Sequence, residues 1–439
     1  MTGEDRDEGF PRNPRSILIK NALTLKKNRV DVYIENGVIS EMKNRDRGEK
    51  IGVEADFVVD ASDKIVMPGL VNTHTHAAMT LLRGYADDME LQPWLEKKIW
   101  PAEARLTPEL VYWGTRLACL EMIKTGTLIF NDMYFYMEEV AKAVEDCGMK
   151  ALLGYGMIDL FSEEKREEEI KKTEDFVSFV KNLGSPRIKA AVAPHAIYTV
   201  SDEGLRWCAE FAEEKDLAIH IHVSETRKEV EDSIAKYGES PVRHLHKLGV
   251  LTPKTVAAHS VWLDDTDIRI YRQSGVWPSH SPVSNMKLAV GKNMPYREMR
   301  SAGIKPTLGT DGTASNNNLD MFESMKFAAL LQKLGGNPTV LPAEETVEMA
   351  TEWGAMALGF KSGILGEGYP ADIILLDTQR PEMTPLHNPF SLVVYSASGS
   401  VVDTAICDGQ ILMYKRAVPG EKEVLEKASL AAKKMLSGN

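Results

Sequence analysis

The chain has 439 residues, 43% of them hydrophobic and 26% charged, which is typical of a globular protein. Its net charge of -12 disfavours nucleic-acid partners, and no segment approaches the ~20 consecutive apolar residues of a membrane span. The polar N-terminus "MTGEDRDEGF" lacks the apolar core of a secretion signal, and the four cysteines are scattered. We therefore expect a cytoplasmic protein with no nucleic-acid or membrane partner.

Both ends of the chain predict β structure. Residues 16–67 contain short alternating runs such as "SILIKNALTL" and "RVDVYIENGVISEM", separated by Asn-Gly and Ala-Ser-Asp turn signals. Residues 361–420 return to this pattern, with Asp408-Gly409 as a hairpin turn signal. The two segments are expected to form one small composite β-sandwich domain. Residues 421–439 have helical periodicity and predict a terminal helix.

Residues 68–360 predict a closed barrel. Short apolar runs, among them "ALLGYGMI", "IKAAVAPH", "LAIHIHV" and "TVAAHSV", alternate with longer amphipathic stretches. Such alternation is typical of βα units around a parallel sheet, and about eight units fit this length. The expected fold is therefore α/β, a (β/α)8 TIM-like barrel. Its chemistry would lie at the carboxyl ends of the strands, so polar residues at those ends are the functional candidates.

The first strand end carries two histidines. The stretch "PGLVNTHTHAAMT" predicts a buried strand ending at His74 and His76, whose side chains leave the same face. Two imidazoles on one face can share a metal ion. Two structural polar residues at a strand end are about equally compatible with this motif alone.

A second pair of histidines, His220 and His222, lies in "LAIHIHVSET" and is followed by Glu225. His222 is nearer the strand end and is the better candidate for a ligand. Glu225 stands where a βα loop begins and can carry a proton. A structural histidine beside a solvated glutamate is the alternative.

Three further strand ends present His195 in "IKAAVAPH", His259 in "TVAAHSV" and Asp311 in "LGTDGTASNNN". Alone, such a histidine is more often a hydrogen-bonding residue, and an Asp between glycines more often forms a turn. Three histidines and one carboxylate from different strands together predict one site for a divalent ion such as Zn²⁺, with an open position for water.

The sequence favours a single metal ion. The helical HExxH motif and the H-x-E plus P-C-x-x-C signature of cytidine deaminases are absent from the chain. A lysine that bridges two metals is not expected, because Lys189 lies six residues before His195 at the strand end. His280 in "SHSPVSN" is a candidate for shaping the pocket. No role is expected for three other histidines, His244, His246 and His387.

This pattern resembles the amidohydrolase superfamily. The motifs "PGLVNTHTH", "HIHVSET", "AAHSV", "SHSPVSN" and "LGTDGTASNNN" occur in order over nearly the whole chain. Within it, "GYADDMELQPWLEKKIWPAEARLTPE" and "GTLIFNDMYF" resemble the methylthioadenosine/S-adenosylhomocysteine deaminase family, and "GYGMIDLF" its archaeal 5'-deoxyadenosine deaminase members. The resemblance implies a metal-dependent barrel with a β domain and a homo-oligomer, either a tetramer or a dimer.

The resemblance also implies roles for residues of this chain. Glu225 is the implied proton shuttle, and His259 orients the attacking hydroxide. Glu103 is expected to hold the ribose hydroxyls, His195 to contact the nucleoside and Trp94 to form a pocket wall. The implied metal ligands are His74, His76, His222 and Asp311.

The expected reaction is hydrolytic deamination of 5'-modified adenosines such as 5'-deoxyadenosine, 5'-methylthioadenosine and S-adenosylhomocysteine. Metal-bound hydroxide attacks C6, Asp311 takes the water proton, and Glu225 donates a proton to N1. The expected cofactor is one divalent ion, Zn²⁺ first, with Fe²⁺ or Mn²⁺ as alternatives. Tyr155 stands where relatives that deaminate S-adenosylhomocysteine carry an Arg, which favours smaller 5' substituents unless Arg166 compensates.

Two alternatives stay open. Another hydrolase with the same site, such as a guanine or cytosine deaminase or a chlorohydrolase, would act on a free base or a chlorinated ring. Glu103, suited to ribose hydroxyls, favours nucleosides. A non-catalytic scaffold on a decayed barrel is disfavoured, because all four ligands and Glu225 are present.

Overall fold

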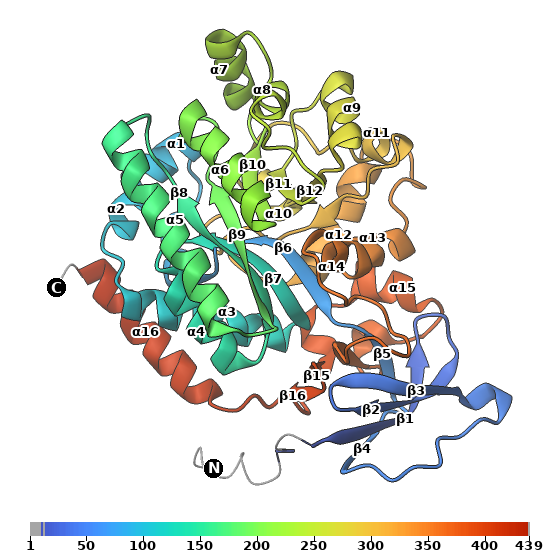
Figure 1. Ribbon diagram of the computed structural model, residues 1–439. Coiled ribbons are helices and arrows are strands. Elements are labelled where there is room, and N and C mark those ends of the chain that lie inside the picture. Colours follow the sequence, from blue (N-terminus) through green and yellow to red (C-terminus); the bar gives the residue numbers. More distant parts are fainter. Residues whose placement is uncertain (1–9, 12–13, 438–439) are drawn as a thin grey trace.

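A computed structural model of the chain describes residues 10–11 and 14–437. Its centre is a parallel sheet of eight strands in the order β6 to β13, which curves into a barrel (Figure 1). This confirms the predicted fold. The strands are β6 (Leu70–Thr75), β7 (Thr127–Tyr134), β8 (Lys150–Met157), β9 (Ile188–Pro194), β10 (Ala218–Val223), β11 (Thr255–His259), β12 (Trp277–His280) and β13 (Thr307–Leu308).

The barrel closes where β13 meets β6. Thr73 Oγ1 donates to the carbonyl oxygen of Leu308 at 2.9 Å, and the Asp311 amide donates to the carbonyl oxygen of His74 at 2.9 Å. Gly309 permits this approach, because a Cβ there would lie 2.8 Å from the His74 Cβ. Closure therefore brings the first and the last strand ends together.

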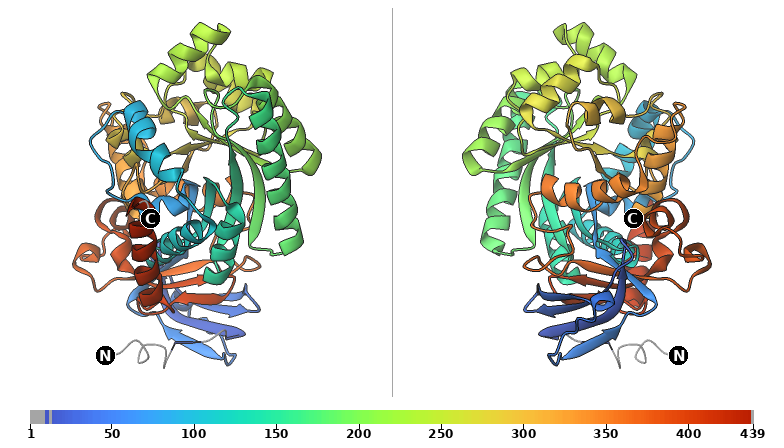
Figure 2. Two further views of the ribbon diagram at one scale, coloured as in Figure 1. Left: turned by 90° about the vertical axis from the view of Figure 1, so that its left-hand side faces the viewer. Right: turned by 90° about the vertical axis from the view of Figure 1, so that its right-hand side faces the viewer.

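Helices cover the outside of the barrel (Figure 2). Their ends carry the expected signals: Ser162 and Ser201 cap helices with their hydroxyls, and Gly148 and Gly184 end helices at φ of 72° and 63°. Within the described ranges, none of the helices combines the length and apolar content that a membrane crossing needs. The helices are α1 (Leu91–Trp94), α2 (Trp100–Glu103), α3 (Pro108–Lys124), α4 (Met137–Cys147), α5 (Glu163–Leu183), α6 (Asp202–Lys215), α7 (Arg227–Tyr237), α8 (Pro241–Lys247), α9 (Asp265–Ser274), α10 (Pro282–Lys287), α11 (Tyr296–Ser301), α12 (Met321–Lys333), α13 (Ala343–Met349), α14 (Glu352–Ala357), α15 (Pro389–Ser391) and α16 (Glu421–Ser437).

The second sheet is built from both ends of the chain, as the sequence predicted. Its order is β16-β15-β14-β5-β1-β2-β3, and β4 pairs with β1. The hairpin turns Asn36-Gly37 and Asp408-Gly409 have φ of 50°, 83°, 47° and 71°, as a type I′ turn requires. The strands are β1 (Ser16–Thr24), β2 (Arg29–Glu35), β3 (Val38–Asn44), β4 (Phe57–Asp60), β5 (Lys64–Pro68), β14 (Ile373–Asp377), β15 (Val402–Cys407) and β16 (Gln410–Met413).

A buried lysine joins the two sheets. Lys150, at the start of β8, places Nζ 2.6 Å from both Asp372 Oδ2 and Asp408 Oδ1. Burial alone would lower the pKa of Lys150, but the attraction of these carboxylates outweighs burial and raises it. The ammonium group therefore stays charged between the barrel and the β domain.

Replacing Lys150 with Met is expected to lower the free energy of unfolding by about 3–5 kcal/mol, because Asp372 would lose its buried partner. The matched control is Lys171→Met. Lys171 pairs with Asp175 at 2.9 Å, with side chains 75% and 62% exposed, and its loss should cost less than about 1 kcal/mol. Urea unfolding of both variants measures the difference, and equal losses would contradict the role of Lys150.

Candidate metal and catalytic site

The predicted strand ends converge at one mouth of the barrel. His74 lies at the end of β6 and is fully buried beside a cavity that opens there. The residues that the sequence pattern placed at strand ends thus lie around one cavity. The other predicted site residues all line this cavity: His76, Trp94, Glu103, His195, His222, Glu225, His259 and Asp311.

Three contacts among four side chains from three strand regions have the same length. His74 Nε2 and His76 Nε2 each lie 3.3 Å from Asp311 Oδ1, and His222 Nε2 lies 3.3 Å from His76 Nε2. Ligand atoms held tetrahedrally at zinc bonding distance are about 3.3 Å apart. The spacing therefore fits one small divalent cation.

The second nitrogen of each imidazole shows which atoms carry lone pairs. His76 Nδ1 lies 2.6 Å from the Met133 carbonyl oxygen, and His222 Nδ1 lies 2.7 Å from that of His195. A carbonyl only accepts, so each Nδ1 donates and, in the neutral ring, each Nε2 is unprotonated. Burial holds the pKa of His222 well below its usual value, which keeps this ring neutral. Two such nitrogens 3.3 Å apart repel each other unless a cation lies between them.

His220 supports the site without facing the cluster. Its Nε2 lies 2.8 Å from His74 Nδ1. His74 Nε2, on the other side of the ring, has no hydrogen-bond partner among the described residues and points toward Asp311. The distinction that the sequence drew between His220 and His222 therefore agrees with the geometry.

Hydroxyl groups hold the Asp311 carboxylate in place. Ser284 and Ser315 donate to Oδ2 at 2.6 and 2.9 Å, and the Gly312 amide donates to Oδ1 at 2.7 Å. Burial would raise the pKa of Asp311, but His74 and the other imidazoles hold it well below its ordinary value. The carboxylate therefore stays ionised. Neither serine was a predicted site residue, although Ser284 lies within "SHSPVSN" and Ser315 within "LGTDGTASNNN".

His259 and Glu225 face each other on the cavity wall. His259 Nδ1 donates to Asn285 Oδ1 at 2.9 Å and lies 3.8 Å from Glu225 Oε1. Burial would lower the pKa of His259, but Glu225 and Asp311 outweigh burial and raise it. Burial also raises the pKa of Glu225, so this carboxyl group holds a proton more readily than an exposed one.

Glu229 on α7 holds the backbone that presents Glu225. Its carboxylate accepts from the amides of Ser224 and Glu225, each at 2.8 Å. Burial raises the pKa of Glu229 to about 7. Sequence analysis missed this residue, because a glutamate in the first turn of a helix is usually an ordinary N-terminal charge.

The backbone is strained at several of these strand ends. Ser224, His259, Ser260 and Asp311 have φ of 51°, 66°, 51° and 65°, in the left-handed region that non-glycine residues rarely adopt. Such conformations cost on the order of 1–3 kcal/mol each and cluster at functional sites. Here they direct side chains into the cavity.

Glu103 and Trp94 also line the cavity. Glu103 Oε1 accepts from the Tyr134 hydroxyl at 2.7 Å, and the surrounding protein excludes water and raises its pKa to about 7. Trp94 is 5% exposed and donates from Nε1 to the Ala86 carbonyl at 2.9 Å. His195 bonds Thr199 through Nδ1 at 2.8 Å, and exclusion of water lowers its pKa to about 3.

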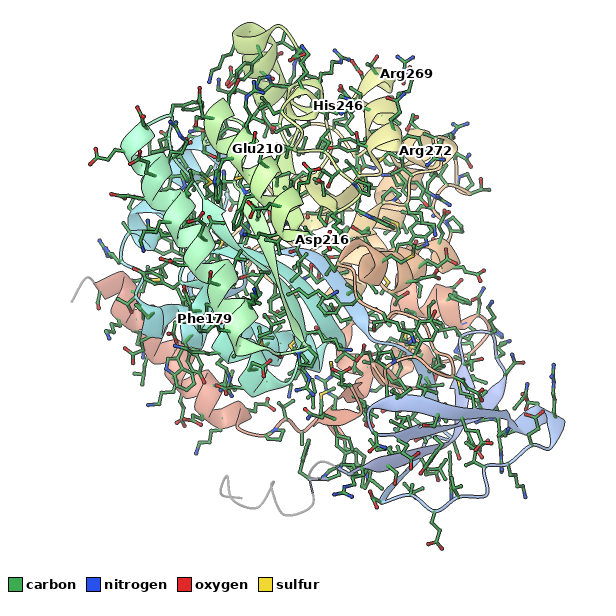
Figure 3. The ribbon with its side chains drawn as sticks, viewed as in Figure 1. Phe179, Glu210, Asp216, His246, Arg269 and Arg272 are labelled. Atoms are coloured by element: carbon green, nitrogen blue, oxygen red, sulfur yellow. The ribbon has the colours of Figure 1, made fainter. Side chains whose placement is uncertain are left out.

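The remaining histidines lie away from the cavity wall. His244 is buried, stacks on Tyr237 and lies 2.9 Å from Asp202, which makes it structural. His246 is exposed on the outer surface at α8 (Figure 3). His280 is buried, and its two ring nitrogens have no partner in the part of the chain that is described. It does not line the cavity.

Comparisons with known proteins agree with this site. The 5'-deoxyadenosine deaminase of Methanoregula boonei is 53% identical, with 99% of this chain and 98% of that protein covered. The 5-methylthioadenosine/S-adenosylhomocysteine deaminase 1 of Archaeoglobus fulgidus is 48% identical, with coverages of 95% and 99%. The zinc-bound crystal structure of an adenosine deaminase from Xanthomonas campestris has a TM-score of 0.89 at 33% identity, with coverages of 96% and 98%.

The sequence profile of the amidohydrolase family matches residues 65–412. The matched region contains the whole barrel and every residue of the site described above. The chain therefore belongs to the amidohydrolase family.

Proposed function

We propose that this protein is a metal-dependent aminohydrolase that removes the C6 amino group of 5'-modified adenosines as ammonia. Its substrate class comprises 5'-deoxyadenosine, 5'-methylthioadenosine and S-adenosylhomocysteine. Relatives named as deaminases of these nucleosides at 48% and 53% identity support the proposal. The observation that carries it is the group of ligand atoms 3.3 Å apart at the floor of a cavity that Glu225 also lines. A homo-oligomeric state and a cytoplasmic location remain predictions.

The cofactor is one divalent cation held by His74, His76, His222 and Asp311. Three imidazoles and one carboxylate suit Zn²⁺, with Fe²⁺ and Mn²⁺ as alternatives. The bound zinc of the Xanthomonas campestris structure supports this choice. When bound, the cation acts as a Lewis acid and lowers the pKa of a coordinated water to about 7.

Glu225 acts as the acid. It is buried, and burial raises its pKa, so the carboxyl group takes up a proton more readily than an exposed glutamate does. Attack on C6 places negative charge on the ring, and a proton donated to N1 neutralises that charge. The clamp of Glu229 on the Glu225 amide fixes the position from which the proton is delivered.

Asp311 and His259 act on the attacking water. The ionised Asp311, fixed by its serine partners, accepts the water proton. His259 is fixed by Asn285 and directs the oxygen toward C6. Glu103 lines the same cavity and binds the ribose. Its carboxylate can accept a hydrogen bond from each of the two ribose hydroxyls.

Purified protein is expected to release ammonia from 5'-deoxyadenosine, to lose this activity after chelation and to regain it with Zn²⁺. Guanine, cytosine and a chlorotriazine serve as competing substrates, with ammonia or chloride release as the readout. Turnover of these compounds without turnover of nucleosides would refute the proposal in favour of another hydrolase.

Glu225→Gln is expected to lower kcat by at least ~100-fold, because glutamine keeps the size of the side chain but has no proton to donate. Elemental analysis should find the same metal content as in the unmodified protein. Near-normal turnover would exclude Glu225 as the acid.

Protonation of Glu103 should weaken nucleoside binding. Since its pKa is about 7, the carboxyl group gains a proton as the pH falls below that value and then accepts hydrogen bonds less well. We expect KM for 5'-deoxyadenosine to rise between about pH 8 and pH 6. Glu103→Gln should raise KM by ~10-fold or more and flatten this dependence, since its side chain does not titrate. An unchanged pH profile in the variant would contradict the assignment.

A further inference from the structure

A second cavity of about 610 Å³ adjoins the site. It lies against α4 and α5, and we call it the annex. Beyond the shared wall its lining includes Tyr155 and five charged residues, Glu138, Lys165, Glu169, Lys172 and Asp175. The annex and the site cavity share four residues, Trp100, Glu103, Phe135 and Ile158.

The shared wall places the annex on the ribose side of the site. On the proposed function, Glu225 marks the position of the adenine and Glu103 that of the ribose. A 5' substituent therefore has open space beside it, next to the apolar side chains of Trp100, Phe135 and Ile158, which line both cavities. Such an apolar lining suits a thioether-linked alkyl chain.

One wall of the annex is a row of alternating charges. Lys165, Glu169 and Lys172 lie on one face of α5, because they are spaced by four and three residues. Glu169 is fully engaged: its carboxylate accepts from the Ile158 amide at 3.1 Å, the Tyr155 hydroxyl at 3.1 Å and Lys172 Nζ at 2.7 Å. It anchors this wall and leaves Tyr155 without a free hydroxyl proton for a ligand.

Two half-buried charges in the annex lack such partners. Neither Lys165 nor Glu138 forms an ion pair within 4.0 Å with any residue of the described ranges. Arg166, the candidate to compensate for the absence of an Arg at position 155, does not line the annex. Its Nη1 lies 3.4 Å from Ser201 Oγ and 4.0 Å from Glu203 Oε2.

We propose that the annex binds the amino-acid end of a long 5' substituent, with Lys165 and Lys172 facing its carboxylate and Glu138 its ammonium group. The ligand class is a 5'-thioether nucleoside that ends in an amino acid, such as S-adenosylhomocysteine. This inference rests on the proposed function. The annex lysines would then bind the charged tail in a chain that carries Tyr155 where such relatives carry an Arg.

The test compares four nucleosides that differ only at the 5' position. S-adenosylhomocysteine carries both charges, 5'-(3-carboxypropylthio)adenosine and 5'-(3-aminopropylthio)adenosine carry one each, and 5'-deoxyadenosine carries none. The measured quantity is kcat/KM for each tailed nucleoside divided by kcat/KM for 5'-deoxyadenosine. It is determined for the unmodified enzyme, Lys165→Met, the double variant Lys165→Met/Lys172→Met and Glu138→Gln.

Lys165→Met should lower this ratio by ~10-fold for S-adenosylhomocysteine and the carboxypropyl compound, because one charged hydrogen bond is lost. The double variant should lower it further, whereas the aminopropyl compound should be unaffected by either. Glu138→Gln should lower the ratio for the aminopropyl compound and leave the ratio for the carboxypropyl compound unchanged. Arg166→Met is the matched control on the same helix, and its ratios should equal those of the unmodified enzyme.

Unchanged ratios in the double variant, or equal losses for carboxylate and ammonium tails, would overturn the inference. Failure of the unmodified enzyme to deaminate 5'-deoxyadenosine would instead overturn the proposed function. In that case, calorimetric binding of S-adenosylhomocysteine to the same variants still tests whether the annex binds the amino-acid tail. Weaker binding to the lysine variants than to the Arg166→Met control would support the inference, and equal binding would refute it.

Discussion

The contact between His74 and Asp311 across the barrel seam is the constraint on which the site depends. These residues are more than 230 positions apart in the sequence, yet the Asp311 amide bonds the His74 carbonyl. Without this contact the cluster would lack either its carboxylate or its central imidazole. Gly309 keeps the seam close, since any side chain there would meet His74. Barrel closure therefore also brings the His74 and Asp311 side chains together.

Assembly of the cluster has an electrostatic cost that a cation removes. His76 and His222 each donate from Nδ1 to a backbone carbonyl, which leaves lone pairs facing each other at 3.3 Å. The protein supplies these carbonyls from β7 and from the residue that follows β9. The backbone carbonyls of neighbouring strands thus set the tautomer of each of these two histidines, and a bound cation would stabilise the fold as well as supply the chemistry.

The sequence predicted those features in which a local pattern coincides with the end of a strand. The Asp408-Gly409 hairpin follows from turn chemistry, whereas the histidine pairs and Asp311 are candidates only because each is expected at the end of a strand. The strands β12 and β13 have a weaker sequence pattern, because Trp277–His280 contains a proline and Thr307–Leu308 has only two residues.

Residues that act from helices could not be found in this way. Asn285 and Glu229 lie on α10 and α7, and only the packing of these helices on the barrel mouth brings them to His259 and Glu225. The roles of Glu103 and Trp94 came from the resemblance, since neither follows a predicted strand. The same limit applies to α5, where a one-residue shift turns a side chain by about 100° and separates Lys165 from Arg166.

On the proposed assignments, the reaction and the choice of substrate depend on different parts of the fold. The groups around the cation come from strand ends and from the loops just after them, where strained backbone and buried hydrogen bonds leave little freedom. The groups of the annex come from α4 and α5, and Lys172 is exposed. Glu169 ties Tyr155 and Lys172 to the Ile158 backbone without contacting the metal ligands. If the annex binds the 5' group as proposed, a change on α5 would alter which 5' group is accepted while the chemistry at C6 stays the same.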